Sequence, residues 1–363
     1  MKNTFGNALS VTLFGESHGE CTGCVLDGLA PGIEIDEQFI NERLFLRRPD
    51  GYLTTARTET DEFKIVSGIY NNKTTGTPLT IIISNKDVKR TDYESDCILP
   101  RPSHADYTGY IKYNGFNDKD GGGHFSGRIT APLVAASGII LPVLEKNSIR
   151  ICSHIKKIGT VTDRSFEDFE KDFVFLKGKR LPVFSDEAAE KIKTEVLKAK
   201  ENGDSVGGII ETAVTGIPAG LGEPWFDTVE GMISHIIFSV PAIKGIEFGS
   251  GFDLTEKFGS EANDQIEIKN GNITFLSNNM GGIDGGITNG NPLVFRCAVK
   301  PTPTVFKEQK TVNLNTQENC TIKAKGRHDP CIALRISPVI DSVTSLCIYD
   351  MLSQKYGTDW AVK

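Results

Sequence analysis

Four of the six histidines lie in short segments rich in glycine, serine, arginine and proline. An imidazole has an unperturbed pKa near 6.5, so it can give or take a proton at neutral pH. These four residues are therefore candidates for acid–base chemistry. The remaining two, His154 and His235, are more simply explained as structural or surface histidines. The four candidates are His18, His104, His124 and His328.

Arginines gather in or beside the same segments. A guanidinium presents a fork of N–H donors that matches the oxygens of phosphate and carboxylate groups. Glycines such as Gly121 to Gly123 let backbone N–H groups approach a phosphate or a planar cofactor. Together these residue types indicate an enzyme that performs acid–base chemistry on a polyanionic small molecule. The arginines concerned are Arg47, Arg48, Arg57, Arg101, Arg128, Arg327 and Arg335.

Each segment also has a plainer explanation. A Gly-His pair is common in turns, the three glycines could form a flexible loop, and an exposed Arg47-Arg48 pair usually lies on a solvated face. The chain has neither G-x-G-x-x-G after a strand nor a G-x-x-x-x-G-K-[ST] loop. Ordinary dinucleotide and nucleoside-triphosphate sites are therefore not indicated.

Two other classes of function remain as alternatives. One is a metal-dependent hydrolase, but its ligands lack a helical H-x-x-x-H spacing and the nearby arginines would repel a cation, so we predict no metal. The other is a non-catalytic protein that binds anions, supported only by the weakness of each motif taken alone. The ligands of the hydrolase would be His104, Asp106, His124, His328 and Asp329.

The elements that position these residues can be read from hydrophobic periodicity. Runs rich in β-branched residues predict strands, and apolar residues three and four positions apart predict helices. Asp36, Asp227 and Ser185 are the expected helix caps. The predicted strands are 64–69, 79–84, 209–214, 266–275 and 293–299, and the predicted helices follow the three caps and cover 338–354.

Strands and helices mix without a regular β-α-β alternation, which favours an α+β fold over a doubly wound sheet. No linker, repeat or low-complexity tract divides the 363 residues, so we predict a single domain over 1–363. The polar stretch 163–190 is a possible surface insertion.

Composition narrows the possible partners and compartment. Forty Lys and Arg against forty-seven Asp and Glu give a net charge of −7. An acidic chain argues against coating of nucleic acids or a role at a membrane surface. Glycine makes up about 10% of the chain, above the usual level of roughly 7%. We expect no nucleic-acid partner and no membrane association.

No targeting segment is visible at the N-terminus, so we expect a cytoplasmic protein. The longest apolar run, 129–144, contains two prolines and is shorter than the ~20 residues that span a bilayer, which favours a buried helix. The eight cysteines are scattered, and Cys21 and Cys24 form a C-x-x-C without a second pair at zinc spacing. We interpret them as structural thiols.

Several long motifs occur in the order found in one family. The segments 15–19, 121–132 and 326–331 resemble the three signatures of chorismate synthases. Between them, further matching segments lie at 47–49, 101–108, 216–224, 281–286 and 300–304. The resemblance runs from about residue 5 to 350.

This resemblance implies an anti-1,4-elimination of phosphate from 5-enolpyruvylshikimate 3-phosphate (EPSP) to give chorismate, the last common step of aromatic amino-acid biosynthesis. The family requires reduced FMN although the reaction has no net redox change. It implies a β-α-β sandwich, in which helices lie between antiparallel sheets, and a homotetramer.

The resemblance also implies roles for particular residues of this chain. His18, helped by Ser17, would protonate or stabilise the leaving phosphate. His104 would stabilise the anionic reduced flavin, and Asp329 would assist removal of the C6 proton through flavin N5. The implied substrate-binding residues are Arg47, Arg48, Arg101, Arg128 and Arg335. The implied FMN contacts are His124, Phe125, Ser126, Pro241, Ala242, Gly285, Lys300, Pro301, Thr302, Pro303, Thr304 and Arg327.

The chain departs from the family pattern at a few positions. Tyr52 stands where a further arginine is frequent, Asp341 stands where a glutamate is usual, and Ser137 stands where glycine or alanine is usual. His124-Phe125 replaces the Arg-Ser of many members. No appended domain follows the motifs, so we expect an external flavin reductase rather than a built-in activity in which NADPH reduces the flavin.

Overall fold

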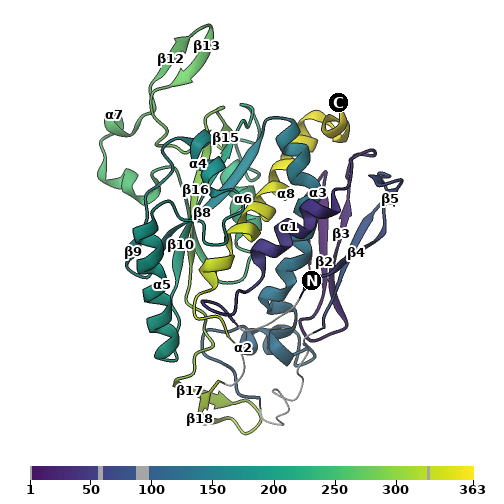
Figure 1. Ribbon diagram of the computed structural model, residues 1–363, viewed down its shortest axis with the longest axis vertical. Coiled ribbons are helices and arrows are strands. Elements are labelled where there is room, and N and C mark those ends of the chain that lie inside the picture. The colour runs from purple at the N-terminus through teal and green to yellow at the C-terminus, as the bar shows by residue number, and fades with distance from the viewer. Residues whose placement is uncertain (1, 56–59, 87–97, 325–327) are drawn as a thin grey trace.

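Two five-stranded antiparallel sheets form the outer layers of the molecule, with helices between them (Figure 1). The structure is a computed structural model, and it describes residues 2–55, 60–86, 98–324 and 328–363. The first sheet has the order β1-β2-β3-β7-β4, with bounds Thr4–Phe5, Ser10–Gly15, Cys21–Asp27, Leu79–Ser84 and Phe63–Ser67. The second has the order β11-β16-β10-β8-β9, with bounds Ile243–Phe248, Leu293–Val299, Gly208–Thr215, Arg150–Ile158 and Val161–Thr162.

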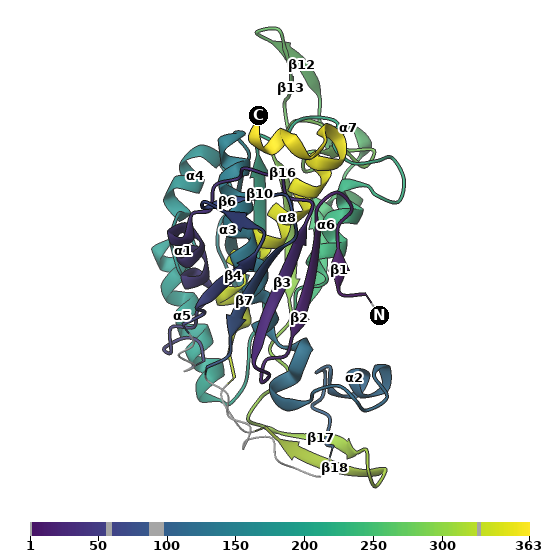
Figure 2. The same ribbon diagram turned by 90° about the vertical axis from the view of Figure 1, so that its right-hand side faces the viewer.

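Three helices fill the middle layer. They are α1 (Glu37–Arg47), α3 (Thr130–Lys146) and α8 (Ser337–Tyr356). α3 and α8 pack on each other, α3 also contacts β3 and β7, and α8 contacts β8 and β10. Figure 2 shows the strands of the first sheet lying over these helices. The α+β class and the β-α-β sandwich are therefore confirmed.

The apolar run 129–144 forms α3 and lies in the core. Its side chains from Thr130 to Ile140 are buried, and Pro142 remains inside the helix. Among the described residues one helix, Gly127–Lys146, is long and apolar enough to cross a membrane, and 83% of its apolar window is buried inside the molecule. This confirms the predicted buried helix. Ser137 belongs to its contact with α8, since the hydroxyl oxygens of Ser137 and Ser342 lie 2.7 Å apart.

Local signals gave two helix starts correctly and one incorrectly. Asp36 accepts a hydrogen bond from the N–H of Phe39 and caps α1, and Ser185 caps α5 (Asp186–Glu201) in the same way. The predicted cap Asp227 is wrong by one residue. Thr228 caps α6 (Val229–Ile237), because its hydroxyl accepts from the N–H of Gly231.

The strand predictions differ from the structure at two places. The run 64–69 is divided into β4 and β5 (Ile69–Tyr70). The run 266–275 is a hairpin, β12 (Ile266–Lys269) and β13 (Asn272–Phe275), because Asn270-Gly271 forms a turn with positive φ at both residues. The predicted strands 79–84 and 293–299 match β7 and β16.

Smaller elements complete the chain. The stretch 163–190 carries α4 (Phe169–Leu176), whose Phe173 and Leu176 are buried, and Val183 joins the main core. The described cysteines are all free thiols, and burial raises the pKa of Cys24 to about 12. The remaining helices are α2 (Asp106–Lys112), α4 (Phe169–Leu176) and α7 (Gly259–Ala262), and the remaining hairpin strands are β6 (Lys73–Thr74), β14 (Ile283–Asp284), β15 (Ile287–Thr288), β17 (Glu308–Asn313) and β18 (Glu318–Lys323).

Candidate active site

A cavity of about 840 Å³ collects most of the candidate residues. This is within the usual range of roughly 300–1,000 Å³ for a small-molecule site. Its walls come from segments far apart in the sequence, so only the folded sandwich creates it. They are β1 and β2, the C-terminal end of α1, the loops 101–105 and 121–130, the end of α6 with the start of β11, and the segments 300–304 and 328–335.

Ser17 and His18 lie behind a glycine turn in the cavity wall. Both are buried, and Ser17 Oγ is 3.1 Å from His18 Nδ1. A Cβ added at Gly121 would lie 1.9 Å from Cε1 of His18, so only glycine leaves room for the ring. Gly121 lines the cavity, whereas Ser17 and His18 pack against its outer side.

His104 lines the cavity on the other side of the same turn. A Cβ at Gly122 would lie 3.4 Å from its Cε1. Its Nδ1 is 2.6 Å from Oδ1 of Asp106, and a carboxylate only accepts, so Nδ1 carries the proton. The glycine turn therefore lies between two histidine rings.

Asp106 holds Arg101 as well as His104. Arg101 donates from Nε to Oδ2 at 2.7 Å and from Nη2 to Oδ1 at 2.8 Å. Burial favours the neutral acid, but the hydrogen bonds from Arg101 and His104 hold the pKa of Asp106 well below its usual range. Asp106 therefore stays charged and fixes both side chains.

A second carboxylate, Asp61, joins two arginines of the cavity. Its Oδ2 accepts from Arg47 Nη2 at 3.0 Å, and its Oδ1 accepts from Arg128 Nη1. Burial opposes the charge of Asp61, yet the two guanidinium groups lower its pKa. Sequence reasoning selected both arginines but missed Asp61, which stands in no segment with a chemical signature of its own. It considered Asp106 only as a ligand of the metal-site alternative.

The third carboxylate is Asp329, which forms an ion pair with Arg335. Arg335 Nη2 donates to Asp329 Oδ2 at 2.8 Å, and the backbone N–H of Thr55 donates to Oδ1 at 3.0 Å. Arg335 also donates from Nη1 to the backbone oxygen of Arg47 at 3.3 Å. Asp329 is thus held on both oxygens at the cavity wall.

Most of the predicted FMN contacts line the same cavity. His124 Nδ1 donates to the backbone oxygen of Gly15 at 2.8 Å. Lys300 Nζ donates to the oxygen of Ser103 at 2.6 Å, and burial together with nearby Lys244 lowers its pKa. Ala242 adopts φ +77°, which is uncommon for a residue with a Cβ. The contacts that line the cavity are His124, Phe125, Ser126, Pro241, Ala242, Lys300, Thr302, Pro303 and Thr304.

Besides Ser17 and His18, three predicted residues in the described part of the chain do not line the cavity. Gly285 lies in the turn of the β14–β15 hairpin, Pro301 is outside the lining, and Arg48 lies beside Arg47 but away from the cavity. Arg327 lies outside the described residues. Of the five arginines assigned to substrate, the structure therefore brings together Arg47, Arg101, Arg128 and Arg335.

The cavity wall contains polar groups suited to a polar, anionic ligand. Four side chains that line it each have a buried nitrogen or oxygen without a hydrogen-bond partner among the described residues. Buried polar atoms are normally paired, so these four mark places where a bound molecule completes the network. They are Arg47 Nε, Arg335 Nε, Thr55 Oγ1 and Thr302 Oγ1. Donors of this kind suit a ligand that carries anionic groups, as the sequence resemblance implies.

The metal-site alternative has little geometric basis. Among the described residues, no three or more His, Cys, Asp or Glu side chains lie close enough together to hold a metal ion. His104 and Asp106 form a pair, and Asp329 is engaged by Arg335 instead.

Comparison with known proteins gives one consistent family. A sequence model described as "Chorismate synthase" matches residues 9–353. The chorismate synthase of Thermococcus kodakarensis is 42% identical over 359 residues, covering 99% of each chain, and that of Archaeoglobus fulgidus is 43% identical over 352 residues, covering 96% and 97%. A solved structure titled "Crystal Structure of Chorismate Synthase" superposes with a TM-score of 0.77 at 30% identity and covers 98% of this chain and 94% of its own. The chain therefore belongs to the chorismate synthase family.

Proposed function

We propose that the arginine-lined cavity is where this chain binds EPSP and eliminates phosphate from it. The family reaction converts EPSP to chorismate and phosphate with reduced FMN and no net redox change. The observation that carries the assignment of the site is the convergence of four arginines, His104 and Asp329 on one cavity. A substrate with a phosphate and two carboxylates needs such a set of cations.

Within this proposal, Arg47 and Arg335 bind anionic groups of the substrate most directly. Each retains a guanidinium nitrogen without a partner among the described residues, whereas Arg128 is held by Asp61, Asn85 and the Ser84 oxygen. Arg101 is engaged by Asp106 and has Nη1 3.4 Å from Thr304 Oγ1. Arg48 remains a weaker candidate because it lies off the cavity wall.

The proposed acid is His18. This role follows the family resemblance, and Ser17 Oγ lies on its Nδ1; His18 itself lies behind Gly121, next to the cavity lining and not in it. His104 would favour negative charge beside the cofactor, and Asp106 keeps its Nδ1 proton fixed. Asp329 would assist removal of the C6 proton of the substrate, and Arg335 and Thr55 fix its orientation.

The cofactor would be held by the residues that line the cavity from Phe125, Pro241 and Ala242 to Lys300 and Thr304. The chemistry that reduced FMN supplies when bound is electron donation to the allylic system as phosphate leaves. Lys300 contributes a cation for the flavin phosphate, and Thr302 contributes a hydroxyl that lacks a partner among the described residues.

Anaerobic turnover of EPSP with dithionite-reduced FMN tests the proposal. We expect chorismate to form with chemically reduced FMN, and Arg335→Ala to raise the KM for EPSP while the protein stays folded. Unchanged KM values in both Arg335→Ala and Arg47→Ala would place the substrate elsewhere. A parallel assay with oxidised FMN and NADPH tests the expected external reductase, since turnover with NADPH alone would show a built-in reduction.

The proposal includes a homotetramer in the cytoplasm. One face of the β12–β13 hairpin supports an assembly, because Ile266 and Ile268 on β12 pair with Phe275 and Ile273 on β13 and the three isoleucines are exposed. This hairpin extends from the body of the molecule (Figure 1). Exposed apolar faces of this kind mark contacts between proteins.

A further inference from the structure

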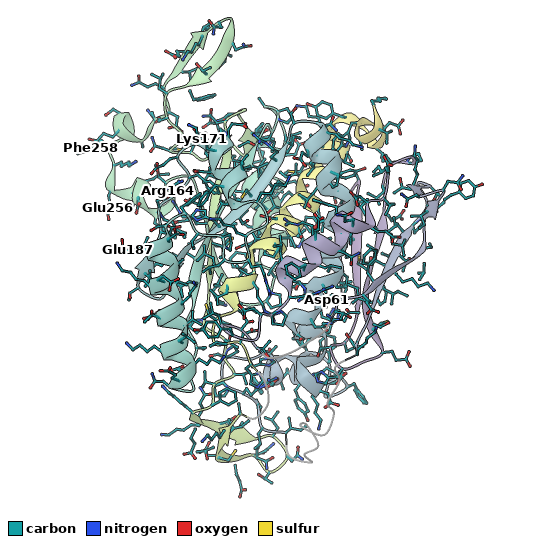
Figure 3. The ribbon with its side chains drawn as sticks, viewed as in Figure 1. Asp61, Arg164, Lys171, Glu187, Glu256 and Phe258 are labelled. Atoms are coloured by element: carbon teal, nitrogen blue, oxygen red, sulfur yellow. The ribbon has the colours of Figure 1, made fainter. Side chains whose placement is uncertain are left out.

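Asp61 has an unusual backbone and an unusual environment. Its φ is +50°, in the left-handed region, and only 3% of the residue is exposed. Residues with a Cβ keep such a conformation where the surrounding structure holds them in it. Figure 3 labels Asp61 within the body of the molecule, whereas the exposed Phe258 lies at its edge.

The contacts of Asp61 are asymmetric. Arg128, on its Oδ1, has further partners, since its Nε donates to Asn85 Oδ1 at 3.0 Å and its Nη2 donates to the Ser84 oxygen at 3.2 Å. Arg47, on its Oδ2, has no other hydrogen-bonded partner for its side chain among the described residues. Arg128 is therefore the anchor, Asp61 the link, and Arg47 the side chain whose position depends on the link.

Charge makes this link necessary. Arg47 is 6% exposed, and burial lowers its pKa, as do Arg335 and Arg128, while Asp61 raises it. Like charges that are buried together repel strongly unless a counter-charge lies between them. Without Asp61, Arg47 would face two guanidinium groups and no carboxylate of its own.

We propose that Asp61 is a positioning residue that holds the Arg47 guanidinium against the cavity wall for an anionic group of the substrate. Asp61 acts through Arg47 and is not itself a group that contacts the reacting atoms. This inference rests on the proposed role of Arg47 in binding EPSP.

Asp61→Asn isolates the carboxylate from the backbone. Asparagine tolerates the left-handed region, and Asn71, Asn72 and Asn114 already adopt it in this chain. The amide keeps the shape of the carboxylate but turns one acceptor into a donor that faces a guanidinium. Since hydrogen bonds to charged groups contribute substantially, we expect the KM for EPSP to rise about 10- to 100-fold while kcat changes by less than about threefold.

A double-mutant cycle separates positioning from general destabilisation. The KM of Asp61→Asn with Arg47→Ala should equal that of Arg47→Ala alone, because Arg128 keeps its hydrogen bonds to Asn85 and the Ser84 oxygen without Asp61. Asp172→Asn is the matched control, since Asp172 is also buried, has a lowered pKa and pairs with Arg164, but lies away from the cavity. We expect Asp172→Asn to leave the KM for EPSP unchanged. When it is combined with Arg47→Ala, the KM should equal that of Arg47→Ala alone.

Three results would overturn the inference. One is an unchanged KM for EPSP in Asp61→Asn although Arg47→Ala raises that KM. Arg47 would then bind the substrate without help from Asp61. Another is a lower KM in Asp61→Asn, which would make Asp61 a competing counter-charge. The third is unchanged KM in both variants, which would also remove Arg47 from substrate binding. If Asp61→Asn does not fold, Asp61→Ser replaces it, because Ser103 and Ser148 adopt the same backbone region.

Discussion

At the scale of residues, each arginine that lines the cavity in the described part of the chain is matched by a carboxylate of the same chain. Asp106 holds Arg101, Asp329 holds Arg335, and Asp61 holds the remaining two. Buried ion pairs of this kind add little net stability, but breaking one leaves an uncompensated charge. The carboxylates therefore fix the arginines before any ligand arrives, which reduces the reorganisation needed during the reaction.

Removal of the imidazole of His18 tests the proposed acid. His18→Ala should lower kcat by roughly 10²-fold or more, the scale of lost general acid catalysis. The measurement is anaerobic turnover with saturating reduced FMN. His235→Ala is the control, because it deletes an imidazole that lines the cavity and has no proposed proton role. Turnover of His18→Ala near the wild-type rate would remove His18 from the mechanism.

Asp106 predicts a particular dependence of stability on pH. Its pKa in the folded state lies below the unfolded value near 3.9, so its stabilising contribution is complete above that value and is lost as the pH falls. Asp106→Asn should therefore cost about 1–3 kcal/mol at pH 7, and the difference from wild type should shrink below about pH 4. Urea unfolding across this range measures the difference. A difference that stays constant down to pH 3 would contradict the ion-pair explanation, and Asp253→Asn at an exposed site serves as the control.

At the scale of elements, sequence signals succeeded where the deciding interaction is local. Asp36 and Ser185 cap their helices through a hydrogen bond three residues away, and β7 and β16 follow runs of apolar residues. The turn that divides 266–275 into two strands also has a local signal, the pair Asn270-Gly271. This signal was overlooked because apolar residues on both sides of the pair suggested one continuous strand. In contrast, the pairing of Asp61 with Arg128 joins residues 67 positions apart and depends on how the sheet meets α3.

The corrected cap of α6 can be tested by a matched pair of substitutions. Thr228→Ala removes the hydroxyl that accepts from Gly231 and should cost about 1 kcal/mol of folding free energy. Asp227→Ala should cost close to nothing at the same helix. Thermal or urea unfolding distinguishes the two variants. A larger loss in Asp227→Ala than in Thr228→Ala would restore the cap predicted from sequence.

At the scale of the whole molecule, the sandwich brings the site together from segments that are distant in sequence. The end of α1, the start of α3 and the segment before α8 all deliver side chains to the cavity, and these three helices form the middle layer. Motif order could identify the family, and the motifs supplied most of the cavity wall. The pairing of carboxylates with arginines could not be predicted, because these partners meet only when the layers pack together.

The β12–β13 hairpin carries a prediction about assembly. Isolated two-stranded hairpins are marginally stable in water. The exposed fractions on one face of this hairpin are 64% for Ile266, 78% for Ile268 and 70% for Ile273, and an apolar face this exposed is typical of a contact surface. If this face contacts another copy of the chain, Ile268→Lys with Ile273→Lys should give a smaller assembly than the wild-type protein by light scattering or sedimentation. Glu267→Lys with Thr274→Lys also replaces two opposed side chains by lysine, but on the other face of the hairpin, and should leave the mass unchanged. A wild-type mass kept by the double isoleucine variant would place the subunit contacts elsewhere, whereas loss of assembly in both variants would mean that charge, rather than the apolar face, controls it.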